Sequence, residues 1–201
     1  MHTASIQFLK RDKYLGAFIK RHGPIKHRRS HKGDAFQSLA EAIIYQQLSG
    51  KAAGTILKRF VALYSPKKFP TPDDVLKTKT EKMRSAGLSG QKASYLKDLA
   101  LKFKDGTINP KLFSKMSDAE IIEHVVAVKG IGEWTAHMFL MFTLARPDVL
   151  PTGDLGIQKG FQKLFALRTK PSPEKMQKLA EPWKGHRTVA CFYLWRLLDQ
   201  K

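Results

Sequence analysis

One acid in the C-terminal part of the chain has both the residue type and the local setting that bond-breaking chemistry needs. Asp154 follows the turn LPTG and precedes an apolar segment with helical spacing. A carboxylate at the start of a helix is fixed in direction, because its oxygen can accept the unpaired N–H groups of the first turn. Asp154 therefore has two compatible roles, as the N-cap of a helix over residues 155–167 and as a catalytic carboxylate.

A hairpin with two glycines lies before this acid. The segment 128–132 reads VKGIG, and its glycines permit positive φ and leave no Cβ in the way of an approaching backbone. An apolar helix is expected from Glu133 to about Leu144, and its first N–H groups suit an anion such as a DNA phosphate. The segment 117–120, SDAE, has the pattern of a capping box and predicts another helix start near Asp118. The order over about residues 118–145 is therefore helix, hairpin, helix.

The segment VKGIGEWTA, followed by LPTGD, resembles the helix-hairpin-helix–Gly/Pro/Asp DNA glycosylases. The likeness covers about residues 5–199 and is greatest to the 3-methyladenine (alkylpurine) DNA glycosylase II group. It implies an enzyme in which Asp154 drives cleavage of the glycosidic bond while the hairpin grips the DNA backbone. Family members that also cut the strand carry a lysine where this chain has Trp134. A tryptophan cannot form a Schiff base, so the resemblance implies a glycosylase without lyase activity.

The resemblance also implies a base pocket and a DNA-binding surface. An everted, cationic alkylpurine would meet aromatic faces, in a pocket formed by Trp134, Trp195, Tyr45 and Met138. The implied DNA contacts are Gln47, Ser49, Lys51, Lys92, Lys129, Gly130, Gly132 and Thr135, with Gln47 as the wedge that fills the gap left by the everted nucleotide. No cofactor is required, although the hairpin can hold a sodium or potassium ion on the backbone carbonyls of Val126, Val128 and Ile131.

Several of these residues also have ordinary structural interpretations. Gln47 fits a polar loop, Trp195 fits the core of an apolar helix, and Lys92 fits a solvated face. The basic segment Lys26–Lys32 fits a solvated loop better than a phosphate contact. Glycine hairpins also occur in modules that hold DNA without chemistry, so a binding module and a glycosylase for another damaged base remain alternatives. Asp154 favours the enzyme, because a protein that only grips phosphates does not need it.

Composition limits the partners and the location. Lys and Arg number 36 against 17 Asp and Glu, a net charge of +19 that is typical of a protein binding a polyanion. The single cysteine, Cys191, excludes an internal disulfide, a cysteine-rich zinc site and a four-cysteine iron–sulfur cluster. The chain shows no signal peptide and no long apolar run. We therefore expect an intracellular protein that binds no membrane, in the cytoplasm or nucleoid of a prokaryote or the nucleus of a eukaryote. The resemblance implies that it is a monomer and that its partner is double-stranded DNA with alkylated bases.

Apolar residues recur at helical spacing almost throughout, and no segment alternates as a strand would. This pattern predicts an all-α fold of roughly nine to eleven helices joined by short loops. The first is expected from Ile6 to Arg21 and the second from Ala35 to about Gln46. The resemblance implies one glycosylase domain over residues 1–201, made of two interlocked helical subdomains. It also implies that the catalytic turn at 150–155 faces an active site in the cleft between them.

Overall fold

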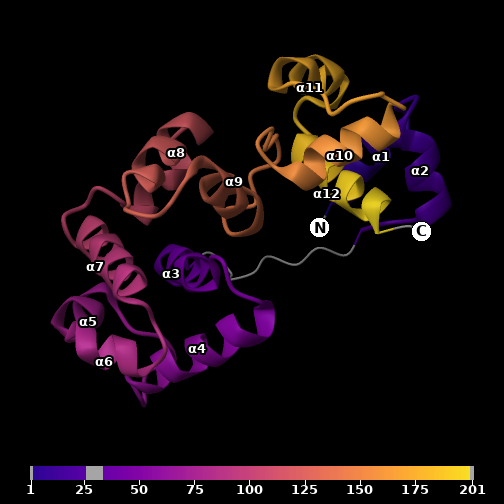
Figure 1. The fold of residues 1–201 in the computed structure, drawn as a ribbon. Coiled ribbons are helices and arrows are strands. Elements are labelled where there is room, and N and C mark those ends of the chain that lie inside the picture. The colour runs from indigo at the N-terminus through magenta and orange to yellow at the C-terminus, as the bar shows by residue number, and fades with distance from the viewer. Residues whose placement is uncertain (1, 26–33, 200–201) are drawn as a thin grey trace. The chain divides into compact units, whose positions relative to one another are not determined.

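The protein is all-helical over the residues that its computed structural model describes, 2–25 and 34–199 (Figure 1). Twelve α-helices, two 3-10 helices and no strand are found within these ranges. The all-α prediction is confirmed, and the number of α-helices is slightly higher than expected. The basic segment Lys26–Lys32 lies outside the described residues.

The chain forms two compact units, each of which is described by itself. The first unit combines Met1–Arg28 with Leu144–Lys201, and the second unit is Arg29–Thr143. The expectation of a single domain over 1–201 made of two interlocked helical subdomains stays a prediction.

The first unit is organised around its last helix. α12 packs against α1, α2 and α10, and its buried residues include Cys191 and Tyr193. The helices of this unit are α1 (Thr3–Leu9), α2 (Leu15–His22), α10 (Leu155–Leu164), α11 (Pro173–Leu179), the 3-10 helix η2 (Glu181–Trp183) and α12 (Arg187–Leu198).

The second unit contains the hairpin formed by α8 and α9 and a group of five helices, α3 to α7. α7 contacts α3, α5 and α6, while α9 contacts both α8 and α3. The helices are α3 (Ala35–Tyr45), α4 (Gly50–Ala62), α5 (Pro72–Lys77), α6 (Thr80–Ser85), α7 (Gly90–Lys104), the 3-10 helix η1 (Pro110–Lys115), α8 (Asp118–Val126) and α9 (Glu133–Phe142). The predicted order of helix, hairpin, helix is confirmed in α8 and α9.

Side-chain caps set several of the helix starts, including those of α3 and α8, which the sequence predicts. Asp34 accepts the N–H of Gln37 at the start of α3, and Ser49 accepts that of Ala52 at the start of α4. Ser117 forms the predicted capping box of α8 with Glu120. Each cap satisfies an N–H that the helix itself leaves unpaired.

The predicted first helix, Ile6–Arg21, is wrong, because the structure divides it into α1 and α2. The Asp12 carboxylate accepts the backbone N–H groups of Tyr14 and Leu15 and so restarts the helix. The turn is tight, since a Cβ on Gly16 would lie 2.5 Å from the Lys10 carbonyl oxygen. Within the described residues, none of the helices has both the length and the apolarity needed to cross a lipid bilayer.

Candidate active site and DNA-binding hairpin

Asp154 is held by two donors that converge on one of its oxygens. Its Oδ1 accepts the Ile157 N–H at 2.8 Å, as the N-cap of α10, and the Trp195 indole N–H at 2.9 Å. The preceding turn is closed by the bond from the Asp154 N–H to the Pro151 carbonyl at 3.0 Å. The carboxyl group is partly exposed, so it is fixed in direction without being sealed from solvent. The predicted helix over 155–167 ends earlier, at Leu164.

A glycine makes room for the indole beside this carboxylate. A Cβ on Gly156 would lie 2.8 Å from Trp195 Nε1 and 3.0 Å from Asp154 Oδ1. Any larger residue would therefore push the indole away from α10. Trp195 is partly exposed. Its indole N–H donates from α12 to the Asp154 carboxylate at the start of α10.

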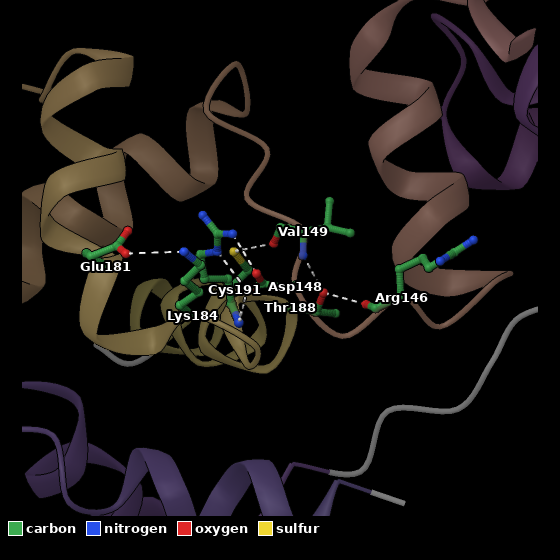
Figure 2. A network of polar contacts seen from close by, with 8 residues as sticks. Arg146, Asp148, Val149, Glu181, Lys184, Thr188 and Cys191 are labelled. Atoms are coloured by element: carbon green, nitrogen blue, oxygen red, sulfur yellow. Dashed lines mark hydrogen bonds and ion pairs between the residues drawn. The ribbon is translucent and has the colours of Figure 1, made fainter. Parts of the chain in front are cut away.

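A polar network fixes the loop that leads into the Asp154 turn (Figure 2). The Thr188 hydroxyl donates to the Arg146 carbonyl at 2.6 Å and accepts the Val149 N–H at 3.0 Å. Asp148 is paired through both oxygens with the Arg187 guanidinium, whose Nε lies 2.7 Å from Oδ1. These contacts tie residues 146–149 to the start of α12, the helix that also carries Trp195.

The variant Asp148→Asn should lower the free energy of unfolding at neutral pH by about 2 kcal/mol, because it leaves the half-buried Arg187 charge without its partner. Burial raises the pKa of Asp148, but the hydrogen bonds and charge of Arg187 outweigh burial and hold the pKa below its ordinary value. A lowered folded pKa means that this stability is present above the unfolded pKa of about 3.9. It is lost as the pH falls through the folded value.

Urea denaturation of the wild type and of Asp148→Asn at neutral and at acidic pH measures this effect. The difference in the free energy of unfolding between the two proteins should shrink on acidification. Asp73→Asn is the matched control, since its ion pair with Lys104 is exposed and should contribute little. An equal difference at both pH values would contradict the assignment of the effect to the Asp148 charge.

Both the backbone conformation and the close packing at position 130 of the hairpin require a glycine. Gly130 has φ 80 in the left-handed region, and a Cβ at this position would lie 2.2 Å from ring carbons of Tyr95 in α7. Gly132 differs from the expectation, because its φ of −99 is open to any residue. Nothing lies within 4 Å of a Cβ on Gly132. The lack of a side chain at this position therefore leaves free space at the start of α9 and is not needed for an unusual backbone conformation.

Three amides of the hairpin are already used within the protein. The Lys129 N–H donates to Asp98 Oδ2 at 2.8 Å. The Val128 N–H donates to the Val125 carbonyl at 3.2 Å, and the Ile131 N–H donates to the Val128 carbonyl at 3.0 Å. The first N–H groups of α9 remain the best candidates for binding a phosphate. Thr135, an implied DNA contact, has a buried side chain, so it would contact DNA through its amide.

The monovalent cation that the resemblance implies would bind the Val128 carbonyl oxygen, which already accepts a hydrogen bond within the hairpin. Val128 O accepts the Ile131 N–H, but a carbonyl oxygen has a second lone pair. The residues therefore fit a monovalent ion, which stays a prediction. No group of three or more His, Cys, Asp or Glu side chains that could hold a metal ion occurs within residues 2–25 and 34–199.

The turn between α3 and α4 is anchored to the hairpin. The Gln46 side-chain amide donates to the Gly130 carbonyl at 2.7 Å. The Lys92 ammonium donates to the carbonyls of Ile44 and Gln46, and burial lowers its pKa. Two of the three Lys92 donors therefore hold the end of α3, a structural role that the sequence did not indicate.

The implied wedge residue lies at the exposed tip of this turn. Gln47 has φ 55, a conformation that costs a non-glycine residue roughly 1–2 kcal/mol. Such strain is common where a side chain is held ready for binding. Ser49 is the N-cap of α4. Lys51 is exposed in the first turn of α4. The positive end of the helix dipole disfavours a cation at this position but attracts a phosphate bound nearby.

The four implied pocket residues fall in both units. Tyr45 and Met138 line one pocket of about 270 Å³ between α3 and α9. Trp134 is 52% exposed on the first turn of α9 and does not line this pocket. Trp195 is with Asp154 in the first unit. The role of each as a wall for a base stays a prediction.

Several residues of the site were not found from the sequence. The bond between Trp195 and Asp154 joins residues 41 positions apart, and the bond between Gln46 and Gly130 spans 84 positions. Gly156, which makes room for the Trp195 indole, was not identified either. Asp98 reaches the hairpin from α7. No local pattern marks these contacts, because helix packing alone brings their partners together.

Comparison with known proteins connects these elements to one family. The model described as "HhH-GPD superfamily base excision DNA repair protein" matches residues 40–185. The chain is 36% identical over 170 residues to DNA-3-methyladenine glycosylase 1 of Schizosaccharomyces pombe, covering 84% of this chain and 75% of that protein. It is 30% identical over 202 residues to the alkylbase DNA glycosidase-like protein mag2 of the same yeast, covering 98% and 91%.

A solved structure extends the likeness to nearly the whole chain. The 3-methyladenine DNA glycosylase Mag1 of Schizosaccharomyces pombe, in complex with abasic DNA, superposes with a TM-score of 0.83 at 33% identity and covers 98% of this chain and 97% of that one. With its helix-hairpin-helix, its Gly/Pro turn and the acid that follows, the chain belongs to the HhH-GPD superfamily of base excision DNA repair proteins, in the group of the 3-methyladenine DNA glycosylases.

Proposed function

We propose that the protein is a monofunctional DNA glycosylase that removes alkylated purines from double-stranded DNA, with Asp154 as its catalytic carboxylate. The observation that carries the proposal is the fixation of the Asp154 carboxyl by the start of α10 and by the Trp195 indole. The 3-methyladenine glycosylases to which the chain is similar support the choice of substrate.

The chemistry needs a negative charge beside the sugar. Alkylation at N3 or N7 makes the purine cationic and a good leaving group. As its bond to C1′ breaks, positive charge develops on the deoxyribose, as in other glycoside cleavages. The Asp154 carboxylate stabilises that charge and orients the water that completes the hydrolysis.

The second unit has the task of holding DNA. The amides at the start of α9 bind a phosphate, and Gln47 enters the space that the everted nucleotide leaves. The net charge of +19 draws the protein to the duplex. The protein acts as a monomer in the compartment that holds the DNA.

Trp134 supports the absence of lyase activity, since it stands where strand-cutting relatives carry a lysine. We predict that borohydride added during turnover traps no covalent adduct between protein and DNA, because an indole cannot form the imine that borohydride reduces. Denaturing gel electrophoresis of a labelled duplex gives the answer. A trapped adduct would show that another amine of the chain attacks C1′.

A base-release assay tests the function. Duplexes carrying 3-methyladenine, 7-methylguanine, ethenoadenine or hypoxanthine are incubated with excess protein, and the free base is measured by chromatography. Release of the methylated purines supports the proposal. If the protein binds every duplex but releases a base from none, it is a DNA-binding module without glycosylase activity.

A further inference from the structure

The first turn of α7 carries a lysine whose ammonium group is bonded to the end of another helix. Lys92 Nζ donates to the Ile44 carbonyl at 2.7 Å and to the Gln46 carbonyl at 2.8 Å, and the side chain is partly buried. These carbonyls lie at the C-terminal end of α3, where the helix itself offers no N–H to bind them. Lys92 therefore caps α3 from α7, at the helix end where the dipole favours a cation.

Gln46 extends this contact to the hairpin. Its carbonyl accepts from Lys92, while its side-chain amide donates to the Gly130 carbonyl at 2.7 Å. The next residue, Gln47, has φ 55 in the left-handed region. A non-glycine residue stays in this region only where its surroundings hold it there. The two bonds of Gln46 hold the backbone immediately before this strained residue.

The first half of α7 also contacts the hairpin directly. The Tyr95 ring lies against Gly130, where an added Cβ would come within 2.2 Å of it. Asp98, one turn further along α7, accepts the Lys129 N–H at 2.8 Å. The turn after α3 and the hairpin are therefore both bonded to α7, and Gln46 bonds them to each other.

We infer that Lys92 is a positioning residue for base eversion, which fixes Gln47 relative to the hairpin so that bound DNA meets the wedge in one place. The inference deepens the proposed function and rests on it, because it takes Gln47 as the wedge. It replaces the phosphate contact that the resemblance implies for Lys92. The ammonium charge is matched by carbonyl dipoles, and burial lowers the pKa of Lys92.

The variant Lys92→Met removes the donors and keeps nearly the same side-chain length. Without these bonds Gln47 can leave its strained conformation, so the rate of 7-methylguanine release at saturating protein should fall about tenfold. Lys97→Met is the matched control, since it removes the same charge from a partly exposed position of α7. The control should keep the wild-type rate, and the two variants should bind an undamaged duplex with equal affinity.

Salt dependence distinguishes positioning from a phosphate contact. If Lys92 neutralised a phosphate, Lys92→Met would reduce the slope of log affinity against log salt concentration by about 1 and leave the rate at saturation unchanged. That result would overturn the inference. A slope equal to that of Lys97→Met, together with the slower release, supports it.

Chemical rescue separates the ammonium group from a general effect on folding. The only cysteine of the chain, Cys191, is buried, and burial raises the pKa of its thiol, so the cysteine of Lys92→Cys can be alkylated selectively. 2-Bromoethylamine rebuilds the lysine side chain with sulfur in place of one methylene group and should restore the release rate. 1-Bromopropane adds an uncharged group of the same length and should not. Equal rates after the two treatments would contradict the positioning role.

Fluorescence separates this inference from the proposed function, because it requires no base release. In a duplex with 2-aminopurine beside a tetrahydrofuran abasic-site analogue, the signal reports unstacking at the site. Saturating wild type and Lys97→Met should raise it equally, and Lys92→Met should raise it much less. If this pattern is seen but the wild type releases a base from no duplex, the proposed glycosylase activity fails and the positioning role stands. If the wild type releases bases and Lys92→Met matches it in both signal and rate, the inference fails and the glycosylase stands.

Discussion

Asp154→Asn should reduce the rate of base release by about a thousandfold or more, while DNA affinity is unchanged or higher. The asparagine removes the negative charge that stabilises the developing sugar cation, and losses of this size are usual when such a group is neutralised. Asparagine is as good an N-cap as aspartate. Its Oδ1 can still accept the N–H groups of Ile157 and Trp195, so the fold of the turn should survive.

Single-turnover release of 7-methylguanine, measured with excess protein, gives the rate, and binding of the same duplex gives the affinity. Asp199→Asn, an exposed acid at the end of α12 in the same unit, is the control for a general charge effect and should retain the wild-type rate. A normal rate in Asp154→Asn would refute its catalytic role and leave Asp154 as a helix cap only.

Features of the fold that depend on neighbouring residues could be predicted from the sequence. The starts of α3 and α8 were predicted correctly because Asp34 and Ser117 each accept the backbone N–H of the residue three positions later. The break between α1 and α2 was missed, although Asp12 also acts locally. The apolar pattern continues across it, and the tight approach of Lys10 to Gly16 has no sequence signature.

The site divides in the same way. Asp154 and the hairpin glycines could be singled out from the sequence because each lies in a turn that precedes a helix start, and their roles in the site stay predictions. The contacts that hold them were not found, since Trp195 reaches Asp154 across 41 positions and Gln46 reaches Gly130 across 84.

Gly130→Ala should damage the hairpin in two ways, and the two glycines provide an internal comparison. The new methyl group would overlap the Tyr95 ring at 2.2 Å and would have to occupy φ 80. Forcing a side chain into a packed site and into the left-handed region should cost roughly 2–4 kcal/mol of the free energy of unfolding. DNA affinity should fall with it, because the displaced hairpin no longer presents the amides at the start of α9.

Gly132→Ala is the matched variant, since its φ of −99 suits alanine and no atom lies near the added Cβ. Gly132 is the N-cap of α9, where alanine is a poorer cap than glycine, but alanine also lowers the entropy of the unfolded chain. Because the two effects oppose each other, the free energy of unfolding should stay within about 1 kcal/mol of that of the wild type. Any loss of DNA affinity in Gly132→Ala would then come from the methyl group obstructing a phosphate, not from a weakened fold. Thermal denaturation and duplex binding of both variants separate these effects, and wild-type stability in Gly130→Ala would show that the contact with Tyr95 does not fix the hairpin.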